Sequence, residues 1–109
     1  METFLQRLEQ QKAREREDSR LATLARLRTA TSEHLAGLQC VVFGSVLKPG
    51  NFRKNSDVDI ALFDEPAGTS IFSLHSRLEE AIGRNVDLVM LPECRLKEKI
   101  LREGEIWTN

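Results

Sequence analysis

The residues best suited to chemistry lie in one stretch of the sequence, from Phe43 to Leu62. Within it, the segment Asp57–Phe63 (DVDIALF) alternates as a β-strand does, so Asp57 and Asp59 are expected to project from the same face. Neighbouring carboxylates repel each other at pH 7, and a fold tolerates them most readily where a divalent cation bridges them or where solvent reaches both. The pattern therefore predicts either a metal-binding pair or the polar face of an exposed edge strand.

A glycine and a serine, Gly44 and Ser45, lie just upstream at the end of an apolar run. Glycine at a strand end lets the backbone approach a ligand closely, and the serine hydroxyl with adjacent N–H groups can hold a phosphate oxygen. Lys48, Arg53 and Lys54 follow in the same loop and are expected to place a positive field beside the acidic pair, which suits a metal-bridged triphosphate. A Gly-Ser pair alone is also typical of a plain turn, so its value comes from its distance to the acidic pair.

A third acid, Asp87, interrupts the apolar segment Val86–Leu91 (VDLVML). A charge in such a strand must reach solvent, a base or a metal, because burying it without a partner is costly. If this strand lies beside DVDIALF, Asp87 joins the first two acids around one site; otherwise it faces solvent. Asp64 and Glu65 are ordinary turn formers beside a proline.

The elements that must position these residues begin with a long helix, because residues 2–37 contain no proline and no glycine before Gly37. Residues 9–20 are almost entirely polar, so only the second half reads as a core helix, through Leu21, Leu24, Leu27, Leu35 and Leu38. A straight helix of this length would be about 54 Å long, beyond the roughly 35 Å width of a compact domain this size. We therefore expect residues 1–20 to form a polar helical arm and residues 21–109 a single domain.

Short strands are expected at residues 38–43, 57–63 and 86–91, with a loop over residues 44–56. Ser70 can cap a helix that Gly83 ends, with an apolar face of Ile71, Leu74, Leu78, Ala81 and Ile82. A last short helix is marked by Leu96, Ile100 and Leu101. The helix between the second and third strands favours their parallel pairing, whereas the first strand's direction stays open. The predicted fold is α/β (α+β), a small mixed sheet of three or four strands flanked by helices.

The combination of Gly44-Ser45, Asp57-x-Asp59 and a later strand carboxylate, Asp87, resembles the nucleotidyltransferase superfamily of DNA polymerase beta type. The short chain resembles the minimal nucleotidyltransferases (MNT) that act as antitoxins of HEPN ribonuclease toxins. Eleven residues separate Ser45 from Asp57, one more than that family commonly has.

The resemblance implies a polymerase beta-like fold and a Mg²⁺-dependent protein adenylyltransferase that moves AMP from ATP to a hydroxyl, with a tyrosine of the HEPN toxin as acceptor. It implies that Asp57, Asp59 and Asp87 are catalytic and hold two Mg²⁺ ions. The nucleotide-binding residues it implies are Gly44, Ser45, Lys48 and Ser56. The alternative is an antitoxin that neutralises its toxin by binding alone.

Composition and charge bear on which partners and which cellular compartment are expected. The 109 residues carry 16 Lys+Arg against 17 Asp+Glu, a net charge of −1, which argues against direct binding of bulk nucleic acid. The sequence has neither a secretory h-region nor an apolar stretch long enough for a bilayer, so a cytoplasmic protein with reduced Cys40 and Cys94 is expected. Surface or packing roles are favoured for His34 and His75, and Trp107 either covers the sheet edge or anchors a partner.

Overall fold

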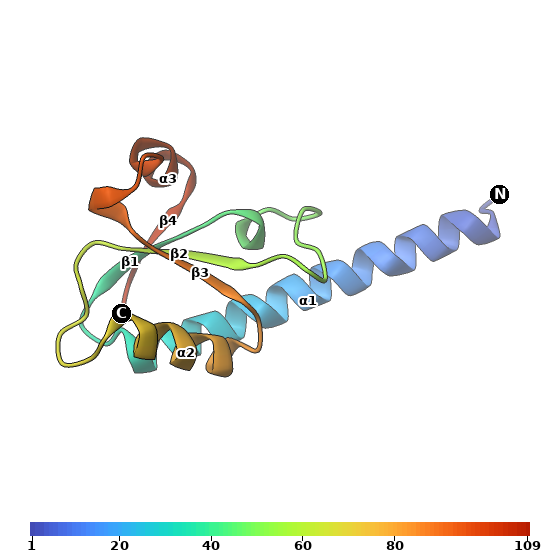
Figure 1. The fold of residues 1–109 in the computed structure, drawn as a ribbon. Helices are drawn as coiled ribbons and strands as arrows, with labels where there is room; N and C mark the ends of the chain where they lie inside the picture. The colour runs from blue at the N-terminus through green and yellow to red at the C-terminus, as the bar shows by residue number, and fades with distance from the viewer.

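The fold is a four-stranded sheet with two helices on one face and a short helix on the other (Figure 1). The computed structural model describes residues 1–109. Along the chain the elements are α1 (Phe4–His34), β1 (Gln39–Phe43), the 3₁₀ turn η1 (Ser45–Leu47), β2 (Val58–Leu62), α2 (Ile71–Ile82), β3 (Val86–Met90), η2 (Leu91–Glu93), α3 (Lys97–Glu103) and β4 (Glu105–Thr108). The α+β class, the mixed sheet and the long N-terminal helix are confirmed.

The strands lie in the order β3-β2-β1-β4. β2 and β3 are parallel, as the helix between them predicts, and β1 is antiparallel to both β2 and β4. The order expected from the sequence ended with a helix, so β4 was missed. Its four residues follow α3 directly, and only Ile106 and Trp107 are apolar, which is too short a run to predict a strand.

The main core lies between the sheet and the two long helices. Alternate residues of β2 face it, namely Val58, Ile60 and Leu62, all at most 2% exposed. α2 contributes Leu74, Leu78 and Ile82, one buried stripe at helical spacing, and it is capped by Ser70 and ended by Gly83 in a left-handed conformation as predicted. Ala81, which was expected on this face, is exposed. A smaller cluster, Val41, Ala61, Leu91 and Ile100, lies on the opposite face under α3.

Helix α1 is one continuous helix, and its N-terminal part extends beyond the sheet (Figure 1). The molecule measures 58 × 28 × 20 Å for this reason. Thr3 and Gln6 form a capping box at its start. The expected leucine pattern is confirmed in part: Leu27 and Leu35 are buried and Leu24 packs against the core, whereas Leu21 is 51% exposed and Leu38 39% exposed. The other buried positions of α1 are Arg20, Thr23, Ala30 and Thr31. The three polar ones can be buried because each side chain donates a hydrogen bond to a backbone oxygen.

The C-terminal strand completes the sheet edge beside β1 and brings Trp107 into the main core. Trp107 is 7% exposed, and the guanidinium of Arg28 lies 4.4 Å from its ring centroid. Trp107 therefore belongs to the edge strand itself and faces α1. No helix combines the length and the apolar character that crossing a bilayer requires.

Candidate active site

The site begins with two carboxylates on neighbouring strands. Asp59 of β2 and Asp87 of β3 are direct partners in the parallel register. Residues in register on adjacent strands point to the same face of a sheet, and the strands lie about 4.8 Å apart. Both carboxylates therefore project from the face opposite α1 and α2, at the edge where these two strands begin. The sequence left open whether the strand of Asp87 lies beside the strand of Asp59, and the structure shows that it does.

The third predicted acid, Asp57, precedes the first residue of β2 and is exposed. The pKa of Asp59 is raised to about 6. The largest cause is burial, and the negative charges of Asp87 and then Asp57 add to it. Asp59 is half-buried, whereas Asp57 and Asp87 are exposed. Asp59 is thus the carboxylate that gains most from any positive charge brought to this surface.

Gly44 brings the backbone of the first strand directly against Asp59. Phe43, the last residue of β1, is the register partner of Asp59. Gly44 then turns with φ 82° and ψ −157°, a conformation that essentially only glycine adopts. A Cβ atom at position 44 would overlap Oδ2 of Asp59. Ser45 follows and starts η1, so the predicted glycine–serine corner lies beside one of the predicted acids.

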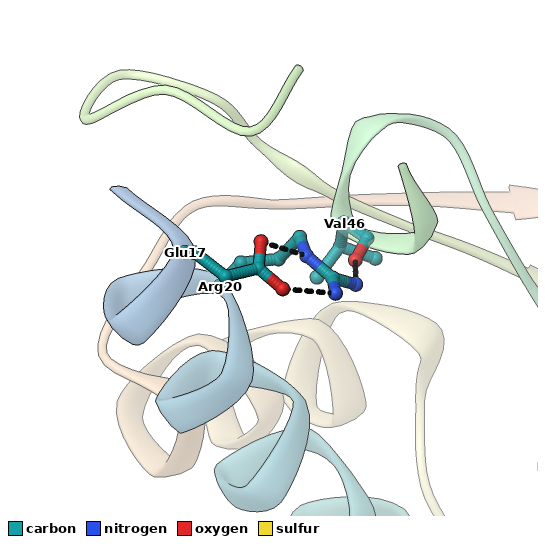
Figure 2. A network of polar contacts seen from close by, with 3 residues as sticks. All are labelled: Glu17, Arg20 and Val46. Atoms are coloured by element: carbon teal, nitrogen blue, oxygen red, sulfur yellow. Dashed lines mark hydrogen bonds and ion pairs between the residues drawn. The ribbon is translucent and has the colours of Figure 1, made fainter. Parts of the chain in front are cut away.

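A buried arginine fixes η1 behind this corner. Figure 2 shows the Arg20 guanidinium between the Glu17 carboxylate and the backbone of Val46. Its Nη1 donates to the Val46 carbonyl oxygen at 3.1 Å, and its Nε and Nη2 donate to Glu17 at 2.9 and 2.6 Å. The hydrogen bond to Glu17 raises the pKa of Arg20 and lowers that of Glu17. Arg20 is a positioning residue that the sequence did not reveal, because it lies in a run of charged residues that reads as solvated surface.

A hollow of about 200 Å³ opens next to Asp59. Phe43, Gly44, Lys48 and Asp59 line one part of it, and Leu96, Lys99, Ile100 and Glu103 line the rest. Lys48 thus lines the same hollow as Asp59. The part contributed by α3 was missed, because nothing in the sequence of that short helix links it to the acidic strands.

The other cations of the loop lie elsewhere. Arg53 and Lys54 were expected to place a positive field beside the acids, but they line a separate hollow against α1 and contribute no residue to the one beside Asp59. Arg84 holds this part of the loop near α1, because it donates hydrogen bonds to the backbone oxygens of Arg53 and Lys54 and to the Ser19 hydroxyl. Ser56 is also used inside the loop, where its hydroxyl accepts a hydrogen bond from the backbone N–H of Arg53 at 2.8 Å.

The carboxylates do not by themselves form a metal cage, because no group of three or more His, Cys, Asp or Glu side chains is arranged to hold an ion. This does not make the donor set unsuitable for Mg²⁺, which commonly binds one or two carboxylates together with substrate phosphates and water. Two facing carboxylates, one with a raised pKa, fit that mode of binding. Carboxylates that could hold cations thus lie next to a glycine corner whose backbone could approach a phosphate.

The fold and the site define a nucleotidyltransferase domain of the polymerase beta type. Residues 27–108 match the family described as "Polymerase beta, Nucleotidyltransferase", and the chain belongs to that family. The family resemblance predicted from the sequence is confirmed. No protein with a curated description matches the chain.

Several solved structures share the fold. One, 25% identical with a TM-score of 0.59, is a toxin–antitoxin with AMP-PNP, and the match covers 78% of this chain and 73% of that one. Another, 23% identical with a TM-score of 0.53, is the toxin–antitoxin MntA-HepT, covered over 82% of this chain and 72% of that one. A third, from Shewanella oneidensis, has the same identity and TM-score and is covered over 71% of its chain.

Proposed function

We propose that this protein is an antitoxin that transfers AMP from ATP to a hydroxyl group of a partner HEPN-type toxin, with tyrosine as the acceptor residue. The observation that carries the proposal is the register of Asp59 with Asp87, together with the contact between Gly44 and Asp59. Membership in the nucleotidyltransferase family supports the reaction class. The similarity to a toxin–antitoxin with AMP-PNP supports both an adenine nucleotide and a toxin partner.

In this proposal the glycine–serine corner and Lys48 bind the phosphates, and the three acids bind the metal ions. Gly44 and Ser45, with Lys48, hold the β- and γ-phosphates of ATP in the hollow beside Asp59, and Ser56 stabilises the loop that carries them. Asp57, Asp59 and Asp87 would hold two Mg²⁺ ions, which supply charge stabilisation to the attacking and leaving oxygens when bound. The acceptor oxygen forms a bond to the α-phosphorus, the bond from that phosphorus to the pyrophosphate oxygen breaks, and Asp87 takes the acceptor proton.

The acceptor must lie on another molecule if it is a tyrosine, because this chain contains none. The exposed position of Asp87 leaves room for a protein side chain to reach it. We further propose that the pair acts in the cytoplasm, where ATP is available and free thiols such as Cys40 and Cys94 stay reduced.

The decisive experiment is to incubate the protein and its copurified partner with Mg²⁺ and labelled ATP and to follow label on the partner. We expect labelling by the wild type, and loss of at least about 10²-fold in Asp59→Asn and Asp87→Asn with partner binding intact, because charge stabilisation dominates such reactions. Asp64→Asn, which removes one negative charge from the turn after β2, is the matched control and keeps the activity.

The second candidate is an antitoxin that acts by binding alone, and the eleven residues between Ser45 and Asp57, one more than is common in the family, favour it. It makes a different prediction for the same variants. If the wild type never labels the partner, and Asp59→Asn suppresses toxicity as well as the wild type does, the binding mechanism is correct and transfer is not.

A further inference from the structure

A second hollow, of about 280 Å³, lies between the middle of α1 and the loop that joins η1 to β2. Five cationic side chains line it, and we call it the basic hollow: Lys12, Arg16, Arg53, Lys54 and Arg84. It shares no lining residue with the hollow beside Asp59. The net charge of the whole chain is only −1, so its composition gives no sign of this local concentration of positive charge.

Arg84 forms the rigid wall of the basic hollow. Its Nη1 donates to the backbone oxygens of Arg53, Lys54 and Ser56 at 2.9 to 3.2 Å, and its Nη2 donates to the Ser19 hydroxyl at 3.1 Å. Its guanidinium also stacks on Phe52, 4.1 Å from the ring centroid. These contacts tie the loop to α1 and fix the position of Arg84 in the lining of the hollow.

The positive charge of the basic hollow is not neutralised within the protein. None of the five cations forms an ion pair within 4.0 Å. The one carboxylate in the lining, Glu15, accepts a hydrogen bond from the side chain of Gln11 at 3.2 Å instead. Burial, and then the charge of Arg26 outside the hollow, lower the pKa of Arg84.

One donor of the hollow is left without an acceptor. The Nε of Arg16 is buried and has no hydrogen-bond partner. Leaving a buried donor unpaired is costly, so an acceptor brought to this guanidinium would be favourable. An anion bound among the five cations supplies both the missing acceptor and the missing negative charge.

We propose that the basic hollow binds a phosphate-class anion, separately from the nucleotide site. Arginine forks match the tetrahedral oxygens of phosphate, and several cations around one small space favour a multiply charged anion over a single carboxylate. The volume of about 280 Å³ lies just below the roughly 300–1,000 Å³ typical of drug-sized ligand pockets, which suits one or two phosphate groups. The phosphates come either from a free polyphosphate or from the backbone of a nucleic acid.

To test the proposal, the purified chain is titrated with pyrophosphate in the presence of EDTA. Binding is measured by calorimetry and by NMR, through the side-chain N–H signals of Arg16 and Arg84. EDTA prevents metal-bridged binding at the carboxylates, so Asp59→Asn should bind pyrophosphate as the wild type does. The double variant Arg53→Gln/Lys54→Gln should bind at least about tenfold more weakly, as expected for losing charged contacts. The matched control, Arg95→Gln/Lys97→Gln, removes the same charge near α3 and should change binding less than about twofold.

The side chains of Arg53 and Lys54 make no hydrogen bond, so the double variant is expected to fold, and a thermal melt verifies it. If it does not fold, Lys12→Gln on the exposed surface of α1 replaces it. A parallel titration with an oligoadenylate of eight nucleotides identifies the source: tight binding that the same substitutions weaken indicates a nucleic-acid backbone, and binding of pyrophosphate alone indicates a free polyphosphate.

Three results would overturn the proposal. They are no binding of either probe, equal binding by wild type and double variant, and binding of a tetraglutamate peptide as tight as that of pyrophosphate. None of them bears on AMP transfer, whose failure would be seen only in the labelling of the partner.

Discussion

The carboxylate of Asp59 occupies the space that a side chain at position 44 would need. The contact follows from the register, in which Phe43 faces Asp59 and the next residue turns across it. Because Gly44 also has φ 82°, both space and backbone geometry restrict this position to glycine. The glycine of the corner and the acid of the strand are therefore one structural unit.

Substitution of Gly44 by alanine should disturb that unit. We expect Gly44→Ala to lower the free energy of unfolding by about 1–3 kcal/mol, through backbone strain and displacement of Asp59, and to abolish labelling of the partner. Gly50→Ala is the matched control, since Gly50 has φ 86° but nothing within 4 Å of the added methyl group. It should lose some stability and retain labelling. Wild-type labelling by Gly44→Ala would show that this corner does not serve the reaction.

The raised pKa of Asp59 should make the stability of the metal-free protein depend on pH. The folded state keeps the Asp59 proton up to about pH 6, whereas an ordinary aspartate loses it near pH 3.8, so stability falls as pH rises through this window. Asp59→Asn removes the penalty. Urea unfolding in EDTA should find it more stable than the wild type above pH 6, by at most about 3 kcal/mol before solvent screening, and equally stable below about pH 4.

Asp64→Asn is the control for the loss of one negative charge, and it should not reproduce this pH-dependent difference. A constant difference between Asp59→Asn and the wild type from pH 4 to pH 8 would contradict the assignment of the effect to Asp59 ionisation.

Arg20 should matter more than its partner Glu17. Arg20→Met leaves the buried Val46 carbonyl without its donor and is expected to cost about 1–3 kcal/mol. Glu17→Gln keeps that hydrogen bond and loses only a solvent-screened ion pair, so its loss of stability should be clearly smaller than that of Arg20→Met. Urea unfolding of the two variants measures the difference. Equal losses would mean that the ion pair, rather than the contact with η1, is what stabilises the structure.

The C-terminal strand depends on the absence of a side chain at Gly104. A Cβ there would lie 2.7 Å from both the Ile100 oxygen and Cγ1 of Val41. Gly104→Ala should therefore push β4 from β1, lower the free energy of unfolding by about 1–3 kcal/mol and shift the emission of Trp107 to longer wavelength. Gly68→Ala, in open space at φ 75°, should leave the emission unchanged. An unshifted spectrum for Gly104→Ala would show that β4 accommodates the methyl group.

Much of the site could be predicted because its determinants are local. Alternation along DVDIALF predicts which residues of that strand share a face, and the buried Val58, Ile60 and Leu62 confirm it. The caps of α2 are also local, since Ser70 and Gly83 act on backbone groups a few residues away. The leucine pattern at the N-terminal helix was right for Leu27 and Leu35 and wrong for Leu21, because hydrophobicity patterns do not show that Thr23 and Ala30 take buried positions.

Residue types and short-range spacing were enough to predict the family, the long helix and the parallel pair of strands, and to propose which acids form the site. Long-range packing places Asp59 beside Asp87, Arg20 against η1, and Arg53 and Lys54 toward α1. These relationships join residues 26 or more positions apart. Register and loop path are fixed by the packing of the whole core, and no local pattern encodes them.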